Sequence, residues 1–502
     1  MDLESKYEIL RTANFIRSNN FSRVALQFPD ELLRDSTSVA RALRNELGRG
    51  VRLFVMADTA YGSCCVDEIG AAHIDADCVV HFGHACMSPL TTLPAFFVFG
   101  KSSIDVLVCV QSLHHNLSSN NKPILILFGL EYAHALEDIK AKMVSSLPSA
   151  GFSQIVRYAE VTSSIINPSD DNDGINGRNT KVVVLNCGHK EKTLKSEKCS
   201  KLVTGTRYGL GGLEWSIPVD KKIDDYIMVW IGSADSAFAN VVLTFNSCEI
   251  VRYDPERSQF LRDFSGQRKT LKRRYYLVEK AKDANIVGIL VGTLAIAGYL
   301  RMINQMKELI EGAGKKSYTL VMGRPNTAKL ANFPECDVFV YVSCAQTALL
   351  DSKDFLAPVI TPFEATLAFG RGKDWTGEYV VEFGDLMISS PGDFNHFHEA
   401  RFSFFKGGYI EDVQPHENEG QRNDESVGLE LSKAAMNSID RPSDSILFNG
   451  SAQSGVDFFV ARSFKGLNIQ YNNPSPPSYI IGRRGRAAGY DDERKAIYSS
   501  EV

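Results

Sequence analysis

Four cysteines crowd into one short segment of the sequence, residues 64–86, and another stands far from them at Cys344. Thiolates are soft ligands, which suit zinc or an iron–sulfur cluster. The ten cysteines of this 502-residue chain are too few and too scattered for the disulfide scaffold of a small secreted domain. Their clustering indicates metal binding or thiol chemistry instead.

Four of these thiols stand in the loops just beyond apolar runs that are typical of buried strands. The places are Cys64 and Cys65 after Val51–Ala57, Cys86 after Cys78–Phe82, and Cys344 after Val338–Val342. Open α/β sheets build their sites at the carboxyl ends of parallel strands, so a site assembled from distant segments is expected here.

The spacing of the cysteines excludes two common metal motifs. No pair has the Cys-x₂₋₄-Cys spacing of a zinc finger or ribbon, and no ferredoxin-type run occurs. If only three thiols bind, one metal position stays open, as chemistry at a metal requires. From spacing alone, an interpretation in which several of these cysteines are buried and inert stays open.

Other cysteines and histidines carry weaker signals. Cys78 begins an apolar run and is expected to be a small core residue. His81 and His84 flank a strand end, where either proton transfer or hydrogen bonding in the core fits. The cysteines expected to have no metal ligand role are Cys109, Cys187, Cys199, Cys248 and Cys336.

Apolar strand-like runs alternate with amphipathic stretches from about residue 5 to 400, which predicts α/β layers with small parallel sheets flanked by helices. An aspartate precedes an apolar strand three times, at Asp77, Asp225 and Asp337, which favours three similar domains. The predicted strands are Val24–Phe28, Val51–Ala57, Cys78–Phe82, Pro123–Phe128, Val182–Leu185, Tyr226–Ile231, Val241–Phe245, Ile286–Val291, Tyr318–Met322 and Val338–Val342.

Composition narrows the function classes. With 55 Lys and Arg against 60 Asp and Glu, the net charge of −5 argues against a broad nucleic-acid-binding face. The most apolar run, Ala284–Leu300, is short for a membrane span and predicts a buried strand, a turn and a helix. The start MDLESKYEILR lacks a signal-peptide pattern, so we expect a cytoplasmic protein with reduced thiols.

The cysteine segment resembles the diphthamide synthesis family, the 2-(3-amino-3-carboxypropyl)histidine synthases. The double-cysteine block Asp58–Glu68 (DTAYGSCCVDE), followed by His81–Cys86 (HFGHAC), is its most specific signal. Further blocks similar to the family are Phe28–Leu33, Phe128–Tyr132, Tyr253–Pro255, Tyr341–Cys344, Pro358–Glu364 and Ile481–Tyr490. The resemblance therefore covers nearly the whole chain.

The resemblance implies three α/β domains around a central [4Fe–4S] cluster, with an extended C-terminal tail. We place the domains at residues 1–121, 122–265 and 266–405, and a partly disordered extension at 406–502. Similarity points to Cys65, Cys86 and Cys344 as cluster ligands, with Cys64 as a competitor of Cys65. The family's middle-domain cysteine is missing from the comparable block Gly209–Trp215, which marks the second subunit of the eukaryotic heterodimer.

The family reaction moves the 3-amino-3-carboxypropyl group of S-adenosylmethionine onto a histidine of elongation factor 2, through a carbon radical made by a reduced cluster. The missing cysteine implies an accessory role, in which this chain helps to reduce the cluster of subunit 1 and is not catalytic alone. A small iron-binding electron donor and a reductase complete the implied system. Two alternatives remain: a cluster-free scaffold for subunit 1, and a zinc-binding α/β protein.

Overall fold

The computed structural model describes residues 3–56, 61–118, 120–150, 155–168, 205–350, 353–370, 375–388, 401–403, 405 and 407–410, all within the compact unit Met1–Leu467. Several features discussed above lie outside the described residues: Asp58, the strand Val182–Leu185, Cys187, Cys199, the block Ile481–Tyr490 and nearly all of residues 406–502.

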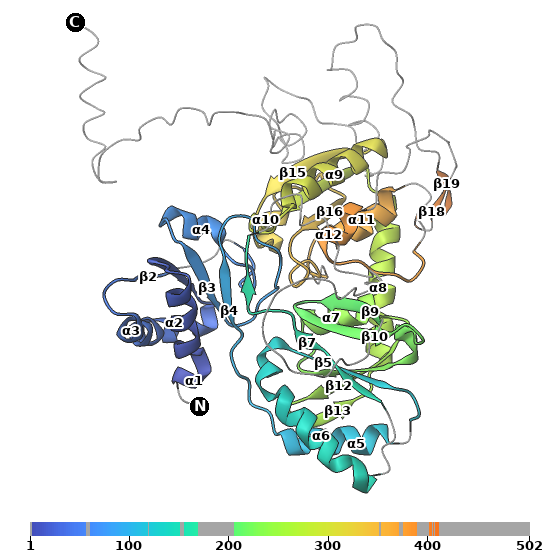
Figure 1. Cartoon of the computed structure of the whole chain (residues 1–502). Coiled ribbons are helices and arrows are strands. Elements are labelled where there is room, and N and C mark those ends of the chain that lie inside the picture. Colours follow the sequence, from blue (N-terminus) through green and yellow to red (C-terminus); the bar gives the residue numbers. More distant parts are fainter. Residues whose placement is uncertain are drawn as a thin grey trace, which may run out of the picture. The chain divides into compact units, whose positions relative to one another are not determined.

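The first sheet is parallel apart from one short edge strand. Its order is β2-β1-β3-β4-β8, and only β8 runs antiparallel to its neighbour. The strands are β1 (Arg23–Gln27), β2 (Arg52–Val55), β3 (Cys78–Phe82), β4 (Ala95–Val98) and β8 (Ile165–Ile166). The helical segments of this part are α1 (Leu3–Tyr7), α2 (Ile9–Ser18), η1 (Asp30–Asp35), α3 (Ser36–Leu47) and α4 (Glu68–His73) (Figure 1).

The second sheet has the order β13-β12-β11-β5-β6, with β13 antiparallel at its edge. Its strands are β5 (Ile124–Phe128), β6 (Val156–Tyr158), β11 (Ile227–Ile231), β12 (Glu249–Asp254) and β13 (Gln259–Leu261). A small antiparallel sheet accompanies it, made of β7 (Glu160–Val161), β9 (Gly205–Leu210) and β10 (Leu213–Pro218). The helical segments are α5 (Val106–Leu117), η2 (Leu130–Ala135), α6 (Leu136–Ala150), η4 (Ile223–Asp225) and α7 (Ser236–Thr244).

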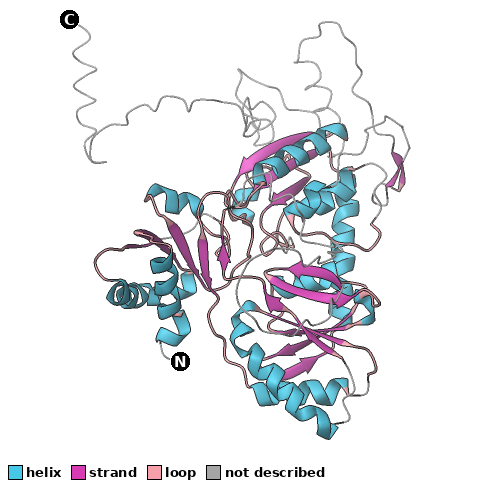
Figure 2. Cartoon of the chain, viewed as in Figure 1, coloured by secondary structure: helices cyan, strands magenta, loops and turns pink. Residues whose placement is uncertain are grey.

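The third sheet is wholly parallel, with the order β15-β14-β16-β17. Its strands are β14 (Ile286–Val291), β15 (Lys316–Val321), β16 (Val338–Val342) and β17 (Val359–Ile360). Its helices are α8 (Phe264–Lys282), α9 (Tyr299–Gly312), α10 (Thr327–Leu330), α11 (Pro362–Phe369) and α12 (Phe383–Ile388) (Figure 2). A separate hairpin joins β18 (Arg401–Ser403) and β19 (Gly408–Ile410).

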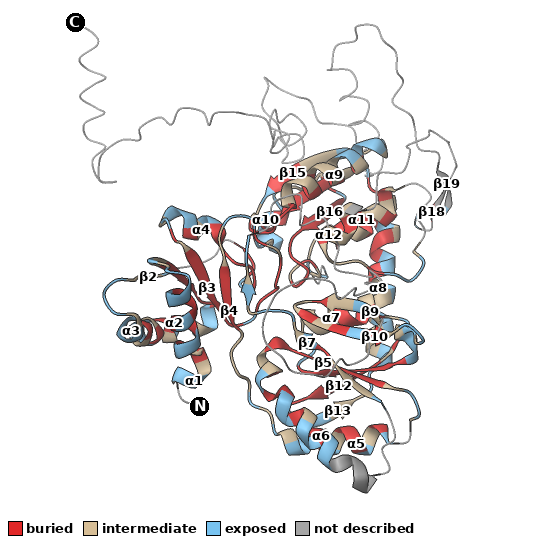
Figure 3. Cartoon of the chain, viewed as in Figure 1, coloured by how far each residue is buried: buried red, intermediate tan, exposed pale blue. Residues whose placement is uncertain are grey.

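The three sheets share one strand order. In chain order, the parallel strands of each sheet run second, first, third, fourth: β2-β1-β3-β4, β6-β5-β11-β12 and β15-β14-β16-β17. The central strands are buried along their length, as continuous apolar runs predict when helices cover both faces of a sheet (Figure 3). The predicted α/β class with three similar domains is confirmed, whereas the domain boundaries stay predictions.

In the first and third domains, the recurring aspartate binds the backbone at the start of the neighbouring strand. The Asp77 carboxylate accepts hydrogen bonds from the amides of Ser22 and Arg23, where the neighbouring strand β1 begins. Asp337 does the same for Asn285 and Ile286 at the start of β14. Asp225 differs, because it accepts from the Lys222 amide and caps the short helix η4.

One predicted strand is wrong. The run Val241–Phe245 lies in helix α7 and at its C-cap, because Asp235 caps the helix by accepting a hydrogen bond from the Phe238 amide. A short apolar run does not distinguish a buried strand from a buried helix segment. Within Ala284–Leu300 the strand and turn are as predicted, and helix α9 begins at Tyr299. Among the described helices, none combines the length and the hydropathy needed to cross a membrane.

Candidate metal centre

Four thiols from two domains meet in the folded chain. The Sγ atoms of Cys64, Cys65, Cys86 and Cys344 all lie within 4.8 Å of one another. Cys64 and Cys344 are 3.5 Å apart, and Cys65 and Cys86 are 3.9 Å apart. No side chain of the four is more than 4% exposed. The expected convergence at strand ends is therefore present, and the ligand role of Cys65, Cys86 and Cys344 stays a prediction.

The donor set fits a thiolate-bound metal. It holds four thiols and no carboxylate or imidazole, which favours zinc or an iron–sulfur cluster over hard cations. Around one tetrahedral zinc with Zn–S bonds of about 2.3 Å, ligand sulfurs lie about 3.8 Å apart. The closest sulfur pairs here have nearly that spacing. A cluster is larger than one ion, so its binding requires these sulfurs to move apart.

The close packing of the thiols determines their proton affinities. Contact with the Cys64 sulfur, which is 3.5 Å from the Cys344 sulfur, holds the pKa of Cys344 well below its usual value. The same contact raises the pKa of Cys64, and contact with Cys344 raises that of Cys65. A metal bound by these thiols would replace their protons, so its affinity would depend on pH.

Gln27, at the end of β1, clamps the loop that carries the two adjacent cysteines. Its Nε2 donates to the Cys65 carbonyl at 2.7 Å, and its Oε1 accepts from the Asp67 amide at 2.9 Å. Gln27 is 1% exposed, so no water replaces these bonds readily. The loop is also tied to the next one, because the Cys86 amide donates to the Cys64 carbonyl. The backbone of the thiol loops is thus fixed without any metal ligand bond.

His81 supports the same loop from strand β3. Its Nε2 lies 3.0 Å from the Ser63 carbonyl, an acceptor only, so Nε2 carries the proton and donates. Complete burial lowers the pKa of His81 and keeps the imidazole neutral. Its role is therefore the core hydrogen bonding that was one of the two expected for it.

The second domain holds the Cys344 loop in place. Asn240 of α7 donates from Nδ2 to the Ala345 carbonyl at 3.0 Å. Ser236, at the start of the same helix, donates to the Gln346 side chain at 2.9 Å. Helix α7 therefore positions the backbone that follows Cys344.

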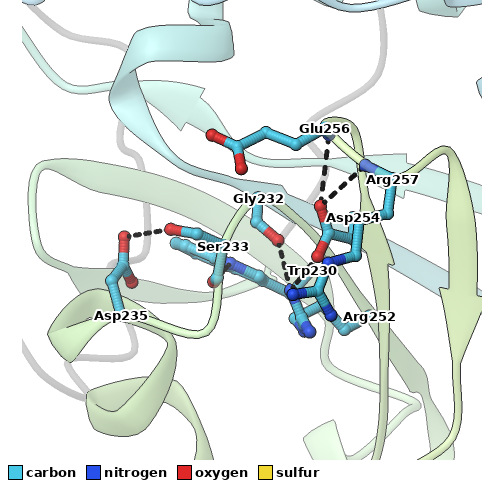
Figure 4. Close-up of polar contacts among 8 residues, drawn as sticks. All are labelled: Trp230, Gly232, Ser233, Asp235, Arg252, Asp254, Glu256 and Arg257. Atoms are coloured by element: carbon cyan, nitrogen blue, oxygen red, sulfur yellow. Dashed lines mark hydrogen bonds and ion pairs between the residues drawn. The ribbon is translucent and has the colours of Figure 1, made fainter.

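Among the described residues of the second domain, no thiol belongs to this group. Its loop after β11 is occupied by internal hydrogen bonds, which Figure 4 shows. Trp230 Nε1 donates to the Ser233 carbonyl, and Arg252 donates to the Gly232 carbonyl and to Asp254. Asp254 in turn accepts from the amides of Glu256 and Arg257. These polar groups thus stabilise the loop after β11 and the neighbouring turn between β12 and β13.

The turn between β9 and β10, Gly211–Gly212, lies inside the glycine-rich block Gly209–Trp215 of the second domain. Gly212 has φ +85°, and a Cβ there would lie 2.6 Å from Met87 Cγ. A Cβ on Gly211, at φ +58°, would lie 3.5 Å from Gln346 Nε2. Both glycines permit close approach, so the turn packs beside residues that follow Cys86 and Cys344.

A cleft lies beside the thiols at the carboxyl end of the second sheet, between β5 and β11, where its strand order reverses. It measures about 530 Å³ including its open mouth. Burial and the nearby Asp235 raise the pKa of Glu131. The polar residues that line the cleft are His84, Glu131, Asp235, Asn240, Gln346 and Glu382. Their carboxylates favour a cationic group.

The remaining described cysteines lie outside the group of four, as expected. Cys78, Cys109, Cys248 and Cys336 are buried in separate places and carry free thiols. Burial raises the pKa of Cys78 and Cys109 to about 12, which keeps both thiols protonated. Cys78 is thus the small core residue that the sequence predicted, and the other three are buried as well.

The supporting residues Gln27, His81 and Asn240 were not predicted as a group. A polar residue closing the apolar run of β1 is the signal that could have identified Gln27. Asn240 lies inside an apolar run that had been taken for a strand, so its position on a helix was hidden. Their partners lie on other segments of the chain, which sequence spacing does not reveal.

Comparison with known proteins identifies the family. A family model described as "Putative diphthamide synthesis protein" matches residues 28–380, which include all four thiols. The chain belongs to the diphthamide synthesis family. Similar family members are named "2-(3-amino-3-carboxypropyl)histidine synthase subunit 2". That of Danio rerio is 33% identical, with 98% of this chain and 92% of the relative covered. That of Gallus gallus is 34% identical, with 98% and 94% covered.

Solved structures of the family share the fold. The crystal structure of Dph2 from Pyrococcus horikoshii matches with a TM-score of 0.51 at 18% identity, over 75% of this chain and 94% of that one. The same archaeal protein with a 4Fe-4S cluster matches with a TM-score of 0.51 at 19% identity, over 74% and 94%. At these identities the likeness shows the fold alone.

Proposed function

We propose that this chain is the accessory iron–sulfur subunit of a two-subunit synthase in diphthamide biosynthesis. The complex transfers the 3-amino-3-carboxypropyl group of S-adenosylmethionine to a histidine of elongation factor 2. The observation that carries the proposal is the group of four buried thiols, joined from two domains, in a chain whose relatives are named subunit 2 of this synthase.

The proposed cluster ligands are Cys65, Cys86 and Cys344. The choice of an iron–sulfur cluster is supported by the similar archaeal protein whose structure is described with a 4Fe-4S cluster. A cluster held there exchanges single electrons at a potential that the surrounding protein sets. Cys64 reaches the same group, 3.5 Å from Cys344. It is therefore the competitor of Cys65 for the ligand position in the first loop, and the replacements below distinguish the two.

The accessory role rests on the second domain. Its block Gly209–Trp215, where the resemblance expects the family's middle-domain cysteine, has none, and the turn of this block packs beside residues that follow Cys86 and Cys344. We assign this subunit the task of accepting an electron from a small iron-binding donor, which a reductase serves, and of passing it to subunit 1. Gln27, His81 and Asn240 hold the thiol loops rigid during that exchange.

Anaerobic purification of the heterodimer tests the metal assignment. Iron, acid-labile sulfide and zinc are measured per chain, and dithionite should bleach a broad visible absorbance. Single replacements of Cys65, Cys86 and Cys344 by Ala should lower the iron bound to this subunit. Cys78→Ala is the matched control, since Cys78 is equally buried and lies outside the group. If only Cys64→Ala lowered iron in the first loop, the assignment of Cys65 would be wrong.

A zinc site is the second candidate function, favoured by the sulfur spacings of 3.5 and 3.9 Å. It predicts a colourless subunit that contains one zinc ion, and replacing any one of the four cysteines should lower the zinc content. A preparation free of both metals would instead support a scaffold for subunit 1. The relay role has its own test: reduction of the cluster in subunit 1 should slow when this chain lacks its thiol ligands. A second measurement asks whether this chain modifies elongation factor 2 alone, and full activity without subunit 1 would reject an accessory role.

A further inference from the structure

Two hydroxyl groups form a chain of hydrogen bonds that ends on a thiol of the metal centre. Thr347 Oγ1 lies 3.1 Å from Cys344 Sγ, a short contact for a bond to sulfur. On its other side, Thr347 Oγ1 is hydrogen-bonded to Ser343 Oγ. Ser343 is 1% exposed, so water does not compete for its hydroxyl. Both hydroxyls lie on the loop that follows β16.

Metal binding fixes the direction of this chain. A metal-bound thiolate has no proton and only accepts, so the Thr347 hydroxyl must donate to the Cys344 sulfur. Thr347 has only one hydroxyl proton, so its oxygen then accepts from the Ser343 hydroxyl. The two hydroxyls thus point one polarised O–H bond at the sulfur. Hydrogen bonds to charged acceptors are the stronger ones.

The first domain holds the Thr347 side chain in this orientation. A Cβ on Gly62 would lie 2.6 Å from Thr347 Cγ2, so only glycine leaves room for this methyl group. The neighbouring Tyr61 carbonyl accepts a hydrogen bond from Arg324 Nε at 2.6 Å, which ties the Gly62 loop to the segment after β15 of the third domain. The Thr347 amide donates to the Cys344 carbonyl as well. The hydroxyl is therefore preorganised beside the thiol.

We propose that Thr347, supported by Ser343, raises the reduction potential of the iron–sulfur cluster by donating a hydrogen bond to the Cys344 sulfur. The inference rests on the proposed function. Reduction adds one electron from the iron-binding donor, with no bond made or broken, and places more negative charge on the ligand sulfurs. A donor aimed at sulfur stabilises that reduced state more than the oxidised one, and hydrogen bonds to sulfur are known to set cluster potentials.

The test is a redox titration of the anaerobic heterodimer, followed by the electron paramagnetic resonance signal of this subunit's cluster. Thr347→Val replaces the hydroxyl by a methyl group of similar size. We expect reduction to become about tenfold less favourable, which is a shift of about 59 mV to lower potential for one electron. Thr347→Ser keeps the donor and should restore the original potential. Ser343→Ala should give a smaller shift in the same direction.

Thr366→Val is the control, because its hydroxyl bonds to the Pro362 carbonyl on helix α11. Its potential should equal that of the unaltered protein. Iron and sulfide content are measured for every variant. An unchanged potential in a Thr347→Val protein that retains its cluster would overturn the inference. If that variant lost its cluster, an unchanged potential in Ser343→Ala would overturn it. Absence of a cluster from the unaltered chain would instead reject the proposed function.

Discussion

The clamp formed by Gln27 gives the most direct test of how the thiol loop is positioned. In Gln27→Leu the side chain keeps a similar size but loses both hydrogen bonds to the loop. The Cys65 carbonyl and the Asp67 amide then lose this partner. Because Gln27 is only 1% exposed, water does not readily take its place. A buried polar group without a partner costs about 1–3 kcal/mol, so the two together cost about 2–6 kcal/mol.

That cost falls on the loop first, because the bonds lost hold the loop and not the core of the sheet. Native-state hydrogen exchange measures it directly at the Asp67 amide, whose protection depends on the Gln27 oxygen. At about 1.4 kcal/mol for each factor of ten, exchange should accelerate about thirtyfold or more. Bound metal per chain should fall in the same preparation, since the Cys65 thiol loses its fixed position.

Two further variants separate hydrogen bonding from packing. Gln27→Glu retains an acceptor for Asp67 but loses the donor to Cys65, so it should also release metal. Gln111→Leu makes the same chemical change at an exposed position of α5 and should alter neither measurement. Unchanged Asp67 exchange and unchanged metal content in Gln27→Leu would refute the role given to this clamp.

Two predictions concern stability. Burial raises the pKa of Asp77, but hydrogen bonds from Arg23 and Ser22 outweigh it and leave this pKa below its usual value. The Asp77 carboxylate therefore stabilises the fold above about pH 4, and this stabilisation is lost as the pH falls further. In Asp77→Asn, the free energy of unfolding should depend less on pH in the acid range. The same pH dependence in the variant and the unaltered protein would contradict this. Arg274 binds the Glu364 carboxylate through two hydrogen bonds, and Glu364 is 0% exposed. Arg274→Met leaves this buried carboxylate without its charged partner. Chemical denaturation should therefore show a free energy of unfolding that is lower by about 3–5 kcal/mol. Arg268→Met, exposed on the same helix, should change it little, and Arg274→Met/Glu364→Gln should lose less than the single variant.

The elements that carry the thiols were predictable because their strands are buried on both faces. β3 and β16 match the predicted runs residue for residue, and their ends place Cys86 and Cys344 at comparable points of two sheets. The sequence could not choose between Cys64 and Cys65, and the folded chain brings both thiols into the group. Adjacent residues usually point apart, so this outcome depends on the tight turn after Gly62.

The supporting contacts were not predictable for a different reason. Thr347 contacts Gly62 and Asn240 contacts Ala345, and each pair joins segments more than one hundred residues apart. Nothing in the local pattern around Thr347 distinguishes a hydroxyl beside sulfur from one facing solvent. The error at Val241–Phe245 has the same origin, since the Asp235 cap and not the apolar run decides that this segment is helical.

Three similar domains are present, and the thiols of the candidate metal centre come, among the described residues, from the first and the third. The second domain keeps the common strand order, and its block Gly209–Trp215, in which we predicted the missing cysteine, forms parts of β9 and β10 and the turn between them. The domain still contributes through α7, which fixes the backbone after Cys344, and through Gly212, which packs against Met87. If the four thiols bind a metal together, its binding free energy is added to the folding of the first and third domains, because the site does not exist in the unfolded chain. We therefore expect the bound metal to stabilise both domains against chemical denaturation.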